Sequence, residues 1–127
     1  MSSNLRDPIA IARGLGSAKD GTGHWWVQRL TAVALLLLAP WFAWFALGLV
    51  GADQQAVRAA IASPFNATLL LAFVLALSWH AQLGMQVIVE DYVHGWPEVA
   101  LQIAIKFAYT LAALASILAI GRIVFTA

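Results

Sequence analysis

The chain has no cysteine and very little charge. None of its 127 residues is Cys, and only 10% are Asp, Glu, Lys or Arg. An ordinary soluble domain carries about 25% charged residues. Without cysteine the chain cannot form a disulfide, a thiolate nucleophile, a Cys-ligated zinc site or its own iron–sulfur cluster. The low charge, the 62% of hydrophobic residues and the mean hydropathy of +0.83 together exclude a soluble globular domain.

Several patterns typical of enzymes and secreted proteins are also missing. The sequence contains no Gly-rich phosphate loop, no His-Glu-x-x-His motif and no pair of carboxylates within an apolar segment. Its net charge of +1 gives no indication of nucleic acid binding. The first apolar run follows a polar head of about 26 residues and is too long for a signal peptide. Any chemistry must therefore use membrane helices and their short ends.

Three long apolar runs dominate the sequence. Each has at least the ~20 residues that a helix needs to cross a hydrocarbon core of ~30 Å. We therefore predict an all-α membrane protein with three transmembrane helices at about 24–50, 64–92 and 97–125. These helices form a single domain, 24–127, which follows a polar N-terminal arm at 1–23.

Proline marks two positions along these helices. Pro40 lies inside the first helix, where it removes a backbone hydrogen bond and is expected to produce a kink. Ser63 and Pro64 are typical of an N-cap and a first helical turn, so they predict a clean start for the second helix. Residues 51–62 are expected to form a loop with weak helical periodicity that lies along the membrane interface.

His80 is the only histidine deep inside an apolar run, and no Asp, Glu, Lys or Arg lies between Ala59 and Val89. An ionisable residue inside a membrane helix is a functional candidate by default. At 100° per residue, His80 shares a helix face with Gly84, Val87 and Asp91. Gly84 leaves that face without a side chain, so a flat, bulky ligand could lie beside the imidazole.

Four interpretations of His80 remain open from these residues. It could be a haem axial ligand, a proton-relay group, a ligand of another metal, or a residue hydrogen-bonded to a neighbouring helix. A b-type haem with two imidazole ligands needs a second deep histidine, and this chain has none. If His80 binds haem, a partner membrane chain must supply the other ligand. His24 and His94 lie near helix ends and are expected at the interface.

Asp91 and Tyr92 form a polar pair about 18 Å along the helix from His80. A tyrosine hydroxyl can donate a hydrogen bond to a carbonyl oxygen, such as that of a lipid-borne quinone. Asp91 could orient this hydroxyl or pass protons from the aqueous phase. Alternatively, the pair only marks the polar end of the helix, with the tyrosine in the aromatic belt of the membrane.

Arg29 follows Trp25 and Trp26, which mark a membrane interface. It either snorkels to the surface or points inward toward an anionic or carbonyl ligand. The head through Arg29 holds four basic residues, whereas the loop after the first helix holds only Arg58 and the C-terminal end only Arg122. The positive-inside rule therefore predicts a cytoplasmic N-terminus and a periplasmic C-terminus, with Arg29 and Tyr92 at the same membrane surface.

The stretch His80-Ala-Gln-Leu-Gly-Met, followed by Asp91-Tyr92-Val93, resembles the hydrophobic membrane anchor subunits of succinate dehydrogenase, respiratory complex II. The specific part is a histidine followed, after ten residues, by Asp-Tyr. The entrance Gly16-Ser-Ala-Lys-Asp-Gly, and then His24-Trp-Trp-Val-Gln-Arg-Leu-Thr-Ala, is similar to the alphaproteobacterial form of this subunit. The resemblance covers nearly the whole chain.

This resemblance implies a role for each candidate residue. His80 is expected to bind the iron of haem b as one axial ligand, with a partner cytochrome b membrane subunit sharing the haem. Tyr92 is expected to hydrogen-bond ubiquinone, with Asp91 beside it, and Arg29 to lie near the haem propionates or the quinone mouth. The other partners are an iron–sulfur subunit and a flavoprotein subunit, which together pass electrons from succinate to the quinone pool at the surface of the bacterial inner membrane. The three helices are therefore expected to be part of a larger heteromeric helix bundle. The chain alone is expected to catalyse nothing.

Two other functions fit the sequence. One is a membrane subunit of a different haem-b quinone oxidoreductase, which would be expected to carry further deep histidines. The other is a non-redox structural or transport subunit, in which His80 packs against a neighbour or relays protons.

Overall fold

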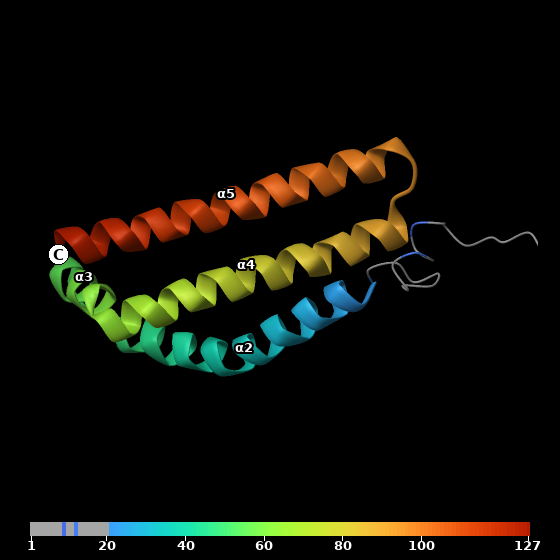
Figure 1. Cartoon of the computed structure of the whole chain (residues 1–127). Helices are drawn as coiled ribbons and strands as arrows, with labels where there is room; N and C mark the ends of the chain where they lie inside the picture. Colours follow the sequence, from blue (N-terminus) through green and yellow to red (C-terminus); the bar gives the residue numbers. More distant parts are fainter. Residues whose placement is uncertain (1–8, 10–11, 13–20) are drawn as a thin grey trace, which may run out of the picture.

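The computed structural model describes Ile9, Ala12 and residues 21–127, and this part of the chain is built from helices (Figure 1). These are α2 (Gly21–Gly48), α3 (Gln54–Ala62), α4 (Pro64–Tyr92) and α5 (Trp96–Thr126). Helices α2, α4 and α5 are long and apolar enough to cross a membrane, which confirms the predicted all-α membrane fold. The arm predicted at 1–23 falls largely outside the described residues, so its separation from the helical domain stays a prediction.

The helix bounds agree closely with those predicted, except in the segment before the second long helix. There the expected loop contains α3, a short amphipathic helix. Asp53 is the N-cap residue of α3, because its side chain accepts a hydrogen bond from the backbone N–H of Ala56 at 2.8 Å. Capping of this kind satisfies an amide that has no partner within the helix.

Ser63 and Pro64 start α4 as predicted, but the serine does not cap the helix through its side chain. Instead the amide of Asn66 donates to the carbonyl oxygen of Ala60 at 2.8 Å and so joins the start of α4 to α3. Pro40 lies within an unbroken α2, whose ribbon bends partway along its length (Figure 1).

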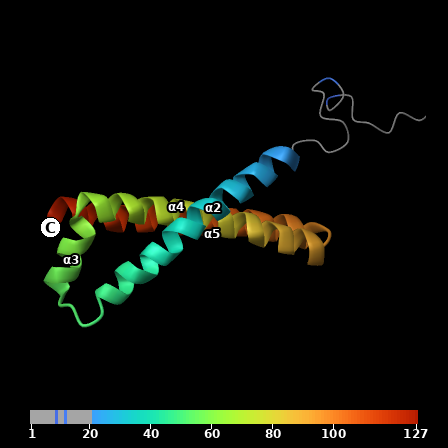
Figure 2. The ribbon, with the colours of Figure 1, turned by 90° about the horizontal axis from the view of Figure 1, so that it is seen from below.

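Helix α4 is the central element of the fold. Helix α2 packs on one side of it and α5 on the other, and α2 does not contact α5 (Figure 1). Seen from below, α2 crosses the α4–α5 pair obliquely (Figure 2). The amide of Gln102 on α5 donates to the carbonyl oxygen of Gln86 on α4 at 3.1 Å, a polar tie between two otherwise apolar helices.

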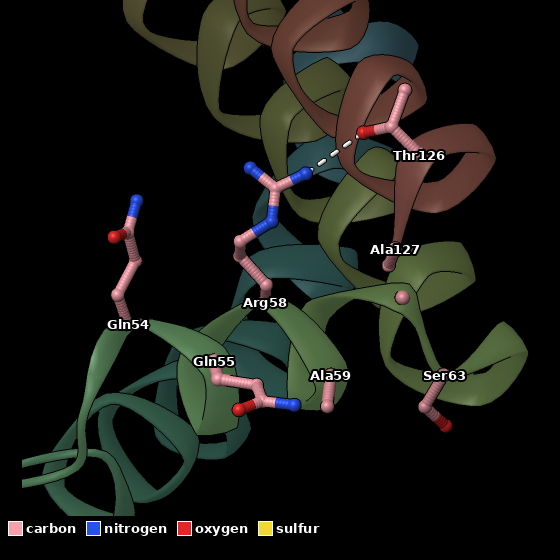
Figure 3. A pocket seen from close by; sticks show the side chains of 8 residues that line it. Gln54, Gln55, Arg58, Ala59, Ser63, Thr126 and Ala127 are labelled. Atoms are coloured by element: carbon pink, nitrogen blue, oxygen red, sulfur yellow. Dashed lines mark hydrogen bonds between the residues drawn. The ribbon is translucent and has the colours of Figure 1, made fainter.

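The start of α2 and the turn from α4 to α5 lie at one end of the molecule, and α3 lies at the other (Figure 1). At the α3 end the Arg58 guanidinium donates to the Thr126 hydroxyl at 2.8 Å, across a cavity of about 760 Å³ (Figure 3). This hydrogen bond joins α3 to the last turn of α5.

The described chain buries few of its own side chains. Among the described residues only five hydrophobic residues are buried, each 6–9% exposed, and all lie on α4: Ala67, Leu70, Ala76, Leu83 and Val89. Large apolar side chains on α2 and α5 are exposed instead. Three helices in a row, with α4 in the middle, cannot enclose a core, so their outer faces must be covered by lipid or by other membrane chains.

Candidate functional site

His80 lies on α4 against α2, where it is half-buried. Its Nδ1 atom is 3.0 Å from the hydroxyl oxygen of Thr31, a residue of α2. The same hydroxyl lies 2.8 Å from the carbonyl oxygen of Val27 and 3.1 Å from that of Gln28. No other hydrogen bond to the His80 ring is formed within the described part of the chain, so its Nε2 atom keeps its capacity to bind a ligand.

A cavity of about 480 Å³ lies beside the imidazole, between α2 and α4. Both helices line it, through His24, Trp25, Gln28, Arg29, Ala32, His80 and Val87. Val87 and His80 both line the cavity, as expected for two residues predicted to share one face of the helix. At Gly84 an added Cβ would meet no heavy atom within 4 Å, which confirms open space beside this face of α4.

Arg29 brings a positive charge to the same cavity. Its guanidinium carbon lies 5.4 Å from the centroid of the Trp25 ring, a cation–π geometry that holds the side chain at the start of α2. Within the described residues Arg29 forms no ion pair, so its charge is available to an anionic group. Such a ligand would meet the guanidinium and the imidazole from one cavity.

Gln28 adds a polar atom without a partner. Its side-chain oxygen is buried and accepts no hydrogen bond from the described residues. A buried polar atom left unpaired is unfavourable by roughly 1–3 kcal/mol, which favours a missing ligand or neighbour. Trp25, Ala32 and Val87 give the cavity apolar walls, beside the polar groups of His80, Arg29 and Gln28.

Asp91 and Tyr92 lie apart from this cavity, at the last turn of α4. Both are exposed, Tyr92 to 83%, and neither side chain forms a hydrogen bond with the residues that the structure describes. Glu90 beside them accepts a hydrogen bond from the Gln86 amide at 2.8 Å, which leaves Asp91 and Tyr92 as the free polar groups of this turn. The structure therefore brings His80 and Arg29 together and keeps the Asp91–Tyr92 pair as a separate surface.

Sequence reasoning did not assign Thr31, Gln28 or His24 to the site around His80. It placed His24 only at the interface, yet this histidine lines the same cavity as His80. The spacing of His24, Gln28 and Thr31 was a usable signal, because residues at i, i+4 and i+7 share one face of a helix. His94 is exposed in the turn between α4 and α5.

Comparisons with known proteins identify the family of the chain. Residues 3–119 match the family model of the succinate dehydrogenase/fumarate reductase transmembrane subunit. The chain is 39% identical to the succinate dehydrogenase hydrophobic membrane anchor subunit of Rickettsia bellii over 93 residues, which are 73% of this chain and 74% of the relative. It is 32% identical to the same subunit of Paracoccus denitrificans over 116 residues, or 91% of this chain and 89% of the relative.

No solved structure shows a significant match to the chain. The family match nonetheless spans nearly all of the sequence, and the three long apolar helices are those of a multi-pass membrane protein. The chain therefore belongs to the succinate dehydrogenase hydrophobic membrane anchor subunits, the non-catalytic membrane subunits of that enzyme complex.

Proposed function

We propose that this anchor subunit binds haem b through His80 and contributes Tyr92 to a ubiquinone site, so that electrons from succinate reach the quinone pool. The observation that carries the proposal is the cavity between α2 and α4, into which one chain brings an imidazole, a guanidinium and an unpaired amide oxygen. The haem would supply a one-electron redox centre next to the quinone site.

His80 would bind the haem iron through Nε2, because Nδ1 is engaged by Thr31. It is the one histidine in the middle of α4, so a second axial histidine would come from a partner cytochrome b membrane subunit. The exposed apolar faces of α2 and α5 support such a partner, since no element in the described part of the chain covers them.

Arg29 would neutralise a haem propionate or an anionic group at the quinone mouth. Its position at the start of α2, in the same cavity as His80, supports both alternatives. A guanidinium pairs well with a carboxylate because its planar donors can form two parallel hydrogen bonds. His24 and the Gln28 side chain lie in this cavity as further polar contacts.

Tyr92 would donate its hydroxyl proton in a hydrogen bond to a ubiquinone carbonyl, with Asp91 beside it in contact with water. Reduction of a quinone takes two electrons and two protons, so a polar mouth open to the aqueous phase suits the reaction. The exposure of both side chains supports a site that is completed by another chain, which we assign to the iron–sulfur subunit. The flavoprotein subunit would bind farther from the membrane.

The chain would lie in the bacterial inner membrane with its N-terminus in the cytoplasm and its C-terminus in the periplasm. Arg29 and Lys106 lie toward the end of the molecule that holds the α4–α5 turn, whereas Arg58 and Arg122 lie toward the α3 end. These four residues are divided equally between the two ends, so the excess of basic residues predicted for the cytoplasmic side comes from the rest of the N-terminal head. Both soluble subunits would then dock on the cytoplasmic side, next to Tyr92.

Purification of the complex through a tag on this chain tests the assembly. We expect a flavoprotein, an iron–sulfur protein and a second membrane protein to co-purify in equal amounts, with b-type haem and succinate:quinone reductase activity. A matched preparation from cells that lack the tag controls for non-specific capture. Recovery of the chain with neither haem nor dehydrogenase subunits would contradict the proposal and favour a non-redox membrane subunit.

A further inference from the structure

The Thr31 hydroxyl has three polar atoms within hydrogen-bonding distance. They are the carbonyl oxygens of Val27 and Gln28, at 2.8 and 3.1 Å, and Nδ1 of His80, at 3.0 Å. A hydroxyl has one proton to donate and two lone pairs that accept. Both carbonyls can only accept, whereas an imidazole nitrogen donates or accepts according to its tautomer.

These constraints favour one arrangement of protons. A threonine in a helix commonly donates to the carbonyl one turn earlier, which for Thr31 is that of Val27. With its only proton donated there, the Thr31 oxygen can serve His80 only as an acceptor. His80 then carries its proton on Nδ1, and the lone pair of the neutral imidazole lies on Nε2.

We propose that Thr31 is a positioning residue that fixes the Nδ1–H tautomer and the ring orientation of His80, so that Nε2 is presented to the haem iron. This inference rests on the haem site proposed above and deepens it. Histidines that bind metals generally donate their other N–H to a nearby acceptor, which orients the ring and makes it a stronger ligand. Loss of such an acceptor typically weakens metal binding by roughly 10–100-fold.

The direction of the effect on the haem follows from this argument. An acceptor on Nδ1–H increases electron donation from Nε2 to iron and so stabilises the ferric state more than the ferrous state. Removal of the acceptor should therefore raise the midpoint potential. A tenfold loss of preference for the ferric state corresponds to a rise of about 59 mV for a one-electron couple.

The test uses the whole purified complex with Thr31→Val, which keeps the branched shape and removes the hydroxyl. We expect a higher haem midpoint potential, altered low-spin EPR g values and faster loss of haem on heating. Thr31→Ser, which keeps the hydroxyl, should restore all three properties toward wild type. Thr68→Val is the matched control, because the Thr68 hydroxyl donates to the Pro64 carbonyl at 2.7 Å and contacts no histidine.

Each outcome separates this inference from the haem proposal. A Thr31→Val complex with wild-type potential, g values and haem retention would overturn the role of Thr31. Loss of haem in His80→Ala would still support His80 as the haem ligand. If His80→Ala also kept its full haem content with an unchanged α-band, the haem proposal itself would be wrong. If Thr31→Val failed to assemble, Thr31→Ser would decide: a normal complex would support a role of the hydroxyl, and the same failure would contradict it.

Discussion

Phe42 of α2 and Phe73 of α4 stack with their ring centroids 4.5 Å apart and their planes 13° apart. The Thr31–His80 hydrogen bond joins the same two helices nearer the start of α2. Because α2 crosses α4 obliquely, these two contacts fix the position of α2 at separate points along its length (Figure 2). The cavity beside His80 depends on that position.

Phe73→Ala should loosen α2 on α4 and weaken retention of the haem. Stacked aromatic pairs contribute roughly 0.5–1.5 kcal/mol beyond their buried area, and helix association in lipid depends on such packing. We expect the purified complex to lose haem at a lower temperature, with its spectrum unchanged before heating. Phe125→Ala, at a side chain that is 89% exposed, is the control. Equal heat resistance in the two variants would show that the ring stack does not support the site.

Arg29→Ala should lower the haem midpoint potential, if Arg29 lies near the propionates. A positive charge close to the haem disfavours the more positive ferric state, so its removal favours that state. A loss of about 1.4 kcal/mol, reasonable for a partly screened charge, corresponds to a fall of roughly 59 mV. This shift is opposite in sign to the one expected for Thr31→Val.

Two variants control this measurement by redox titration. Arg29→Lys keeps the charge and should show a smaller fall, and Arg122→Ala, at the far end of α5, should leave the potential unchanged. An unchanged potential in Arg29→Ala with a raised KM for quinone would place Arg29 at the quinone mouth instead. A variant in which both properties stayed at wild-type values would exclude Arg29 from the site.

Tyr92→Phe should impair quinone reduction without affecting the haem. The loss of one hydrogen bond of roughly 0.5–1.5 kcal/mol corresponds to a fall of about 2- to 10-fold in kcat/KM for ubiquinone. The chain has two tyrosines, so Tyr109→Phe, on the half-buried side of α5, is the matched control. Succinate oxidation by a soluble artificial acceptor should be normal in both. Normal ubiquinone kinetics in Tyr92→Phe would refute its role.

The absence of cysteine allows a direct test of orientation. We expect Ala52→Cys, in the turn before α3, to react with a membrane-impermeant maleimide added to the periplasmic side of spheroplasts. His94→Cys, in the turn between α4 and α5, should react only in inverted vesicles. Labelling of the denatured chains gives the total for each variant. The opposite pattern would reverse the proposed topology.

Much of the fold follows from local sequence signals. The bounds of α4 were predictable because a Ser-Pro start and a long apolar run determine them with little tertiary help. The face shared by His80 and Val87 followed from helical periodicity. Helix α3 was not predicted as a helix, because nine residues of mixed polarity are too short to form one without a cap and packing partners.

The contacts between helices could not be predicted in this way. Thr31 and His80 are 49 residues apart in sequence, and Arg58 and Thr126 are 68 apart. Their meeting depends on where α2 crosses α4 and on how α3 folds back toward α5, which no local pattern specifies. The polar face of His24, Gln28 and Thr31 was visible in the sequence, but nothing there showed that it faces His80.

The central claim, that His80 is a ligand of haem b, is tested most directly by a dithionite-reduced minus air-oxidised spectrum of the purified complex, with His80→Ala beside wild type. We expect a b-type α-band in wild type that is lost or shifted in the variant, while the dehydrogenase subunits remain bound. An identical α-band and an identical haem content in His80→Ala would contradict the account, because the haem would then be held by other residues.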